Sequence, residues 1–343
     1  MDGVMRSLAR VPWAYIFLFN LAALTAVLLA LALLINHASG GVSSADAITS
    51  DKRIAFSFDD TPRGTGGLVD LKKRPDMLVA ALHKGGVEQA VFFANPGRID
   101  ANGPHASTIP TYGAAGHLVA NHTNTHKPLS RVSAQTFLAD IDAAEIWLKK
   151  QPTYRPWFRF PQLDEGGRNK AKRDAVRAGL KERGLRYGYV TIDGSDWMTE
   201  GLVSKAVAAG QTIDRDALRD LYVETHVKSA ELSNQLARRI LGRAPAQMLL
   251  LHDTDLAALY VDDLAKALKA KGWTIVTADI AFADPLLDRW PDTEIANGNL
   301  LQMLATERGI SGSRFFERND RDVARRLFNE RVLKAKPAMA NKK

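Results

Sequence analysis

The sequence predicts an α/β protein in which parallel strands alternate with helices. From Arg53 onward, short runs rich in β-branched and aromatic residues alternate with longer segments of helical periodicity. This alternation is typical of parallel strands joined by right-handed crossovers. Ionisable residues directly follow several predicted strands, at the edge where parallel sheets bind ligands. A barrel and a doubly wound sheet both satisfy the pattern.

The hydrophobic pattern also places the individual elements. Strands are expected at 54–58, 89–94, 118–120, 157–160, 186–190, 247–251 and 274–276. Helices are expected at 77–83, 134–149, 170–183, 216–241 and 256–271. Beyond Asp284 the periodicity is weak, and no internal repeat is evident.

The N-terminal region is expected to direct the chain to a membrane. Residues 13–35 contain no charged side chain, and at ~1.5 Å per residue a helix of this length could span a bilayer core of roughly 30 Å. Arg6 and Arg10 precede the apolar run, which favours a cytoplasmic N-terminus. We therefore expect a cytoplasmic N-terminus at 1–12 and a transmembrane segment or signal anchor at 13–36.

The rest of the chain divides into a linker, one catalytic domain and an extension. Residues 37–51 are rich in Gly and Ser and indicate a linker, 52–283 form the expected catalytic domain, and 284–343 form a basic C-terminal extension. The domain would then be anchored to the inner membrane and lie in the periplasm. Secretion is the alternative, because Ala45-Asp46-Ala47 has the small-x-small form of a signal-peptidase site. The apolar run exceeds a usual signal core, which favours the uncleaved anchor.

The composition narrows the choice of partners. The formal net charge is +8, but much of the excess of basic residues lies in the C-terminal stretch. The simplest interpretation is that these residues form a solvent-exposed surface. Basic residues are not interleaved with aromatic ones, so we expect no nucleic-acid partner. The chain has no cysteine, so an exported domain would have to be stabilised by a hydrophobic core, to which a metal could add, rather than by disulfides.

Two adjacent carboxylates, Asp59 and Asp60, follow the apolar run 54–58. Adjacent carboxylates repel each other, so both ionise only beside a cation or an arginine. Because Thr61 and Pro62 come next, the pair could equally form a turn or a helix cap. The pair alone leaves both interpretations open.

Two histidines, His122 and His126, follow the predicted strand at 118–120. A spacing of four places both imidazoles on one face of a helical turn, where their nitrogens can converge on one ion. With Asp60 they would complete a two-histidine, one-carboxylate ligand set that leaves positions for water and a substrate oxygen. Two surface histidines on a helix are the alternative. The candidate cofactor is a divalent metal, Zn²⁺ before Co²⁺, Ni²⁺ or Mn²⁺.

Further ionisable residues lie at or just beyond the ends of other predicted strands. These are Arg159, Asp193, Asp196, His252 and Asp253. Each has a structural alternative: an arginine that packs its stem, an Asp-Gly turn, or a helix cap at Asp253. Their common position at strand ends favours one shared site.

Taken in order, these motifs resemble the polysaccharide deacetylase, or NodB-homology, family of carbohydrate esterases. The matching segments are Ser57-Phe58-Asp59-Asp60, His122-Thr-x-x-His126, Arg159-x-Pro161, Asp193-x-x-Asp196-Trp197 and Leu249-x-Leu251-His252-Asp253. The resemblance covers about residues 53–280 and implies a distorted (β/α) barrel.

The resemblance also implies a role for each catalytic residue. The three candidate ligands would hold the metal, and Asp59 would be the general base on a metal-bound water. Arg159 would hold Asp59 in place. His252 would be the general acid, tethered by Asp196.

Further residues are expected to contact the substrate. The resemblance implies that Trp197 and Leu250 surround the acetyl methyl group, with Pro161 and Gln162 also at the substrate. Two residues depart from the family pattern: Thr61 replaces a usual Gly, and Gln162 replaces a usual aromatic residue. Gln162 could still offer its backbone N–H to an oxyanion.

The leading hypothesis is a metal-dependent hydrolase that removes N-acetyl or O-acetyl groups from an extracytoplasmic glycan. The metal would activate water and polarise the carbonyl, while protonated His252 would assist departure of the amine. The expected partners are an acetylated glycan and, through the N-terminal helix, the membrane. Two alternatives stay open: a deacylase of small non-sugar amides on the same scaffold, and a catalytically silent glycan-binding protein of the envelope.

Overall fold

The computed structural model describes residues 52–294, 296–310 and 316–334. Within these ranges, no helix is both long enough and apolar enough to cross a membrane. The predicted segments at 1–12, 13–36 and 37–51 lie outside the described residues. The membrane anchor and the location outside the cytoplasm therefore stay predictions.

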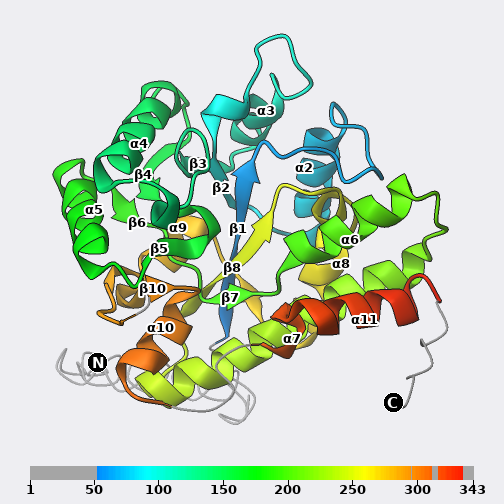
Figure 1. Ribbon diagram of the computed structural model, residues 1–343. Helices are drawn as coiled ribbons and strands as arrows, with labels where there is room; N and C mark the ends of the chain where they lie inside the picture. Colours follow the sequence, from blue (N-terminus) through cyan, green and yellow to red (C-terminus); the bar gives the residue numbers. More distant parts are fainter. Residues whose placement is uncertain (1–51, 295, 311–315, 335–343) are drawn as a thin grey trace, which may run out of the picture. The chain divides into compact units, whose positions relative to one another are not determined.

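An eight-stranded sheet, in which every strand pair is parallel, forms the centre of the domain (Figure 1). Its main path is β6 (Arg186–Tyr187), β4 (Tyr154–Phe158), β3 (Leu118–Asn121), β2 (Val91–Ala94), β1 (Arg53–Thr61), β8 (Ala246–His252) and β7 (Ile192–Asp193). The eighth strand, β9 (Thr274–Ile275), pairs with the start of β1.

The two end strands show that this sheet curls into a partial barrel. β6 and β7 lie at opposite ends of the strand order, yet only residues 188–191 separate them. Because a chain spans at most about 3.6 Å per residue, these strands lie within roughly 18 Å of each other. The N–H of Gly188 donates to the Phe158 carbonyl (2.6 Å), and the N–H of Thr191 donates to the Met248 carbonyl (3.0 Å). This segment thus bridges β4 and β8, and the predicted barrel class is confirmed as a curled parallel half-barrel.

Both faces of the sheet are buried, which explains the continuous apolar runs of its central strands. Phe56 and Phe58 of β1 pack in one hydrophobic cluster with the side chains of α2 (Arg74–Gly85) and α8 (Asp255–Ala270). Ala55 belongs to a second cluster. The side chains of β1 therefore alternate between two apolar layers.

Helices cover the outside of the sheet (Figure 1). The remaining ones are α3 (Thr108–Ala114), α4 (Ala134–Leu148), α5 (Lys170–Glu182), α6 (Asp196–Ala208), α7 (Arg215–Leu241), α9 (Ala278–Phe282), α10 (Leu300–Glu307) and α11 (Arg321–Arg331). Short 3₁₀ turns are η1 (Pro96–Arg98), η2 (Leu129–Arg131), η3 (Pro161–Leu163), η4 (Pro285–Asp288) and η5 (Glu317–Asn319).

The predicted elements are present, but the predicted strand at 186–190 is split and several elements were missed. The chain leaves the edge of β4 after Tyr187 and reaches β8 only at Ile192, so two short strands replace one. The pattern also missed α6, whose buried residues include Asp196 and Glu200. An acidic buried face hides the apolar stripe on which helix prediction depends.

The described residues beyond Asp284, expected to form an extension, pack into the same domain. β10 (Ala296–Asn297) pairs antiparallel with β5 (Asp164–Gly167), and α11 packs against α6 and α7 (Figure 1). Leu300 and Leu304 are fully buried in the second hydrophobic cluster, the one that contains Ala55 of β1. This segment therefore contributes to the core that supports the sheet.

We predict that Leu304→Ala lowers the free energy of unfolding of the full-length chain by about 2–5 kcal/mol, because a fully buried leucine leaves a cavity. Urea unfolding would measure the change. Ile146→Ala is the matched control, since Ile146 lies on α4 with 69% of its surface exposed and should change stability by about 0.5 kcal/mol at most. Equal effects of the two substitutions would mean that α10 contributes nothing to the core.

Candidate active site

The predicted site residues meet at the carboxyl-terminal edge of the parallel strands. Asp59 and Asp60 lie at the end of β1, and His252 is the last residue of β8. Asp59 and His252 are direct neighbours across the two strands. His122 and Arg159 follow the ends of β3 and β4, respectively. Parallel pairing alone thus brings residues from four strands to one edge.

Asp60, His122 and His126 form the cluster expected for a metal. One ligand atom from each residue lies within 4.8 Å of the other two. Oδ1 of Asp60 lies 2.6 Å from Nε2 of His126 and 3.7 Å from Nε2 of His122. This oxygen is buried and has no hydrogen-bond partner of normal geometry among the described residues. A divalent cation could bind the carboxylate oxygen and the two imidazole nitrogens together, so the residues present fit a zinc-type site.

His122 is held in the tautomer that a metal ligand needs. Its Nδ1 lies 2.9 Å from the carbonyl oxygen of Arg159, which can only accept, so Nδ1 carries the proton. Nε2 therefore keeps its lone pair toward Asp60. Burial lowers the pKa of His122 to about 4, so the ring is neutral at physiological pH.

The electrostatics of Asp60 also favour a ligand. Burial acts to raise the pKa of this carboxyl, but the contact with His126 and the charge of His252 outweigh it and hold the pKa well below its usual range. Asp60 additionally forms an ion pair with Arg63 and lies 3.7 Å from Nη1 of Arg98. It is therefore ionised in the folded protein.

The loop from His122 to His126 is not the helical turn that the spacing predicted. Thr123 and His126 have positive φ angles of 63° and 62°, which a right-handed helical turn does not contain, and both imidazoles still reach Asp60. Oδ1 of Asn121 accepts from the N–H of Thr123 (2.7 Å), and Oγ1 of Thr123 accepts from the N–H of His126 (3.0 Å). These local bonds compete with helix formation and stabilise the loop instead.

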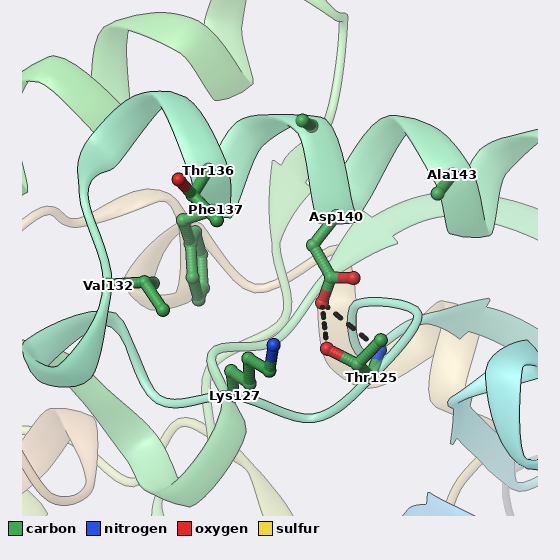
Figure 2. Close-up of a pocket in the computed structure, with 8 residues that line it drawn as sticks. Thr125, Lys127, Val132, Thr136, Phe137, Asp140 and Ala143 are labelled. Carbon is green, nitrogen blue, oxygen red and sulfur yellow. Dashed lines mark hydrogen bonds between the residues drawn. The ribbon is translucent and has the colours of Figure 1, made fainter.

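Helix α4 fixes the outer side of this loop, as Figure 2 shows. Oδ2 of Asp140 accepts from both the N–H and the hydroxyl of Thr125, at 3.1 and 2.9 Å. Lys127 and Phe137 line the adjacent hollow of about 260 Å³. The backbone that carries His126 is therefore anchored next to the metal cluster.

Asp59 is paired with a fully buried arginine. Nη1 of Arg159 donates to Oδ1 of Asp59 at 2.5 Å and to the hydroxyl of Ser57 at 2.9 Å, while Nε donates to the carbonyl of Gly188 at 2.6 Å. The guanidinium also lies 3.8 Å from the centre of the Phe93 ring. Since Arg159 is fully buried, it can orient Asp59 but cannot touch a substrate directly.

His252 is paired with Asp196. Oδ1 of Asp196 lies 2.7 Å from Nδ1 of His252, and Oδ2 accepts from the backbone N–H of His252 at 2.8 Å. Burial acts to lower the pKa of His252, but the Asp196 carboxylate outweighs burial, so the pKa is raised. The ring is thereby disposed to carry a proton.

Backbone strain is concentrated at this site. Of the seven described non-glycine residues with positive φ, six lie around it, at the end of β1, in η3 and on the neighbouring loops: Asp60, Thr123, His126, Gln162, Leu163 and Ser195. Each such conformation costs about 1–3 kcal/mol and persists only where the surrounding contacts hold it. Strain of this kind is typical of a functional site.

One cavity of about 520 Å³ opens onto these groups. Its walls include the predicted contacts Trp197, Leu250 and Gln162, whereas Pro161 is buried at the start of η3 and does not line it. Thr61, the other departure from the family pattern, is fully buried, and its carbonyl accepts from Asn95. The substrate roles of these residues stay predictions.

The cavity also contains residues that the sequence did not single out. These are Arg63, Leu163, Ser195, Gly298 and Arg321. Arg63 could have been predicted from the sequence, because it comes only three residues after Asp60. Gly298 and Arg321 come from the segment beyond Asp284, and nothing in their local sequence indicates a position at the site.

The first half of the catalytic domain is similar to a known protein family. Residues 46–187 match the family model described as polysaccharide deacetylase. This match includes the segments with Asp59, His122 and Arg159, and it ends before those with Asp196 and His252. A search of curated proteins finds no match.

Several solved structures are similar to the chain. Peptidoglycan deacetylase PdaC from Bacillus subtilis has 21% identity and a TM-score of 0.43, with 67% of this chain and 90% of that chain covered. A family 4 carbohydrate esterase from Streptomyces lividans in complex with acetate has 19% identity and a TM-score of 0.42, covering 67% and 95%. A family 4 acetyl xylan esterase from Clostridium thermocellum in complex with a cobalt ion has 18% identity and a TM-score of 0.47, covering 69% and 97%.

We predict that Zn²⁺ stabilises the chelator-treated protein and that His126→Ala removes most of this effect. A ligand that binds only the folded state adds about 2.7 kcal/mol at one hundred times its dissociation constant. Thermal unfolding with and without Zn²⁺ would measure the gain. His83→Ala, on the exposed side of α2, is the control and should keep it. A full Zn²⁺ effect in His126→Ala would mean that the ion binds elsewhere.

Proposed function

Because residues 46–187 match the model of the polysaccharide deacetylase family, we propose that the chain is a metal-dependent hydrolase that removes acetyl groups from a glycan. One observation carries the proposal beyond the family match. Asp59 and His252 line the same cavity as the three candidate metal ligands, and each is held from behind by a buried partner, Arg159 for Asp59 and Asp196 for His252. A base, an acid and a cation site together are what amide hydrolysis requires.

The metal, when bound by Asp60, His122 and His126, would supply Lewis-acid chemistry, activating water and polarising the acyl carbonyl. Asp59 is the group that accepts the proton of the attacking water. Its Oδ1 is occupied by Arg159, while its Oδ2 lies 3.7 Å from Nε2 of His122, on the side of the metal donors. Arg159 thus directs one carboxylate oxygen toward the position where water would be activated.

His252 delivers a proton to the leaving group. An amine leaves poorly unless it is protonated, so the acid must carry its proton at working pH. Asp196 binds Nδ1 and favours the charged imidazolium, which leaves Nε2 for the substrate. Acid and base are then separate residues and need not exchange roles within one turnover.

The acetylated substrate would lie between these groups and the walls formed by Trp197 and Leu250. Both side chains offer apolar surface suited to a methyl group. We propose an N-acetyl group as the first choice and an O-acetyl group as the second, because the family match supports glycan deacetylation without specifying the bond.

The decisive test is acetate release by the Zn²⁺- or Co²⁺-restored protein from chitooligosaccharides, peptidoglycan and an acetylated exopolysaccharide. Asp59→Asn keeps the size of the side chain but removes the base, so kcat should fall by about 100- to 10,000-fold. Asp216→Asn, on the exposed first turn of α7, is the matched control and should retain activity. Absence of metal-dependent acetate release from every substrate, acetylated chromogenic esters included, would refute the proposal.

The Asp196–His252 pair predicts a specific pH dependence. The acid is active when protonated, so its contribution is complete below the pKa of His252 and is lost as the pH rises through it. Asp196→Asn removes the charge that raises this pKa and leaves burial, which lowers it. The alkaline limb of the kcat/KM profile should therefore move to lower pH. An unmoved limb would show that His252 is not the titrating acid.

A further inference from the structure

Two guanidinium groups in the cavity have no role in the proposed reaction. Arg63 lies on the loop after β1, and Arg321 is the first residue of α11, from the segment that the family match does not include. Arg63 is paired with Asp60, whereas Arg321 has no ion pair in the described part of the chain and lies 5.9 Å from the centre of the Trp197 ring. Both are therefore cations at the surface where a substrate would bind.

The backbone of Arg63 is fixed by a buried charge network. Nη1 of Arg74 donates to the carbonyl of Gly64 at 2.8 Å, and Nη2 donates to the carbonyl of Arg63. Arg74 is itself paired with Asp255, whose Oδ2 accepts from the N–H groups of Leu68 and Val69. The loop is thus tied at both ends, and the position of Arg63 is set before any substrate binds.

The backbone that leads to Arg321 is held by contacts of the preceding residues. Nδ2 of Asn319 donates to the carbonyl of Asp193 at 3.1 Å, which ties η5 to a loop of the site. Arg318 donates to the hydroxyl of Thr225 and pairs with Glu224, both on α7. A preorganised charge binds its ligand without paying the entropy of ordering a loop.

Of the cavity's carboxylates, Asp59 and Asp193 are bound to other groups, and only Asp60 is paired with one of the two arginines. Asp59 is paired with Arg159, and the N–H of Ser195 donates to Asp193 at 2.6 Å. Asp60 faces His126 as well as Arg63. A guanidinium can donate hydrogen bonds to a neutral sugar, but its charge and its fork of N–H donors match a carboxylate or a phosphate better, because those hydrogen bonds are charge-assisted and bidentate.

We propose that the substrate is an anionic glycan, and that Arg63 and Arg321 bind a carboxylate or phosphate group carried near the acetylated position. This inference rests on the proposed function and specifies its substrate class. It also explains why the segment beyond Asp284 reaches the cavity: it supplies one of the two charges that select the substrate.

The test compares substrates that differ only in charge. The probes are neutral chitotetraose, chitotetraose oxidised to carboxylates at C6, and chitotetraose phosphorylated at C6. Equilibrium binding by calorimetry and acetate release are measured on the metal-restored, full-length protein. We expect at least one anionic probe to bind about tenfold more tightly than the neutral one, and salt to reduce this preference. The two anionic arms distinguish a carboxylate from a phosphate.

The variants Arg63→Gln and Arg321→Gln should each reduce the preference, measured as the ratio of anionic to neutral kcat/KM and of the binding constants, by about threefold to tenfold. Arg325→Gln is the matched control, because Arg325 lies on the same helix, is exposed and is paired with Asp322 rather than with the cavity. It should leave the ratio unchanged.

Equal binding of neutral and anionic probes would overturn the inference. So would an Arg63→Gln or Arg321→Gln variant that weakens all probes by the same factor, since these arginines would then only support Asp60 or Trp197. The proposed function fails separately, by absence of acetate release from every probe. In that case the binding constants alone still decide whether the cavity prefers anions.

Discussion

The site depends above all on the contacts of one buried residue, Arg159. Its guanidinium holds Asp59, its carbonyl sets the tautomer of His122, and its Nε binds the carbonyl of Gly188 in the segment that bridges β4 and β8. A buried charge is strongly destabilising when its partner is removed, so these contacts must form together. The same residue thus links the candidate base, a metal ligand and the curvature of the sheet.

Strained backbone conformations position several other residues of the site. Positive φ angles at Asp60, His126 and Ser195 turn the chain sharply at the strand ends, where an extended continuation would carry the side chains away from the centre. Side chains such as Asn121 and Asp140 hold these turns through hydrogen bonds to backbone N–H groups. Part of the stability of the core is thereby used to keep the candidate ligands close together.

The segment beyond Asp284 joins the core to the cavity. Its helix α10 is buried in the second hydrophobic cluster, with Ala55 of β1. The N–H of Gly298 donates to the carbonyl of Leu163, next to Gln162. Further along, η5 contacts the loop of Asp193 and Asp196. One continuous segment therefore supports two walls of the cavity and adds a positive charge to one of them.

The sequence by itself determined the parallel α/β class, the strands that carry the site and the identities of Asp60, His122 and His126. These features are local: apolar runs end in ionisable residues, and parallel strands bring their ends to one edge. Sequence spacing misjudged the loop between His122 and His126 as a helical turn, because its conformation depends on hydrogen bonds from Asn121 and Asp140. Only the tertiary structure decided which charges face the cavity. Arg321 reaches it through the packing of α11 on α6 and α7, a contact between segments about a hundred residues apart that leaves no periodic trace in the chain.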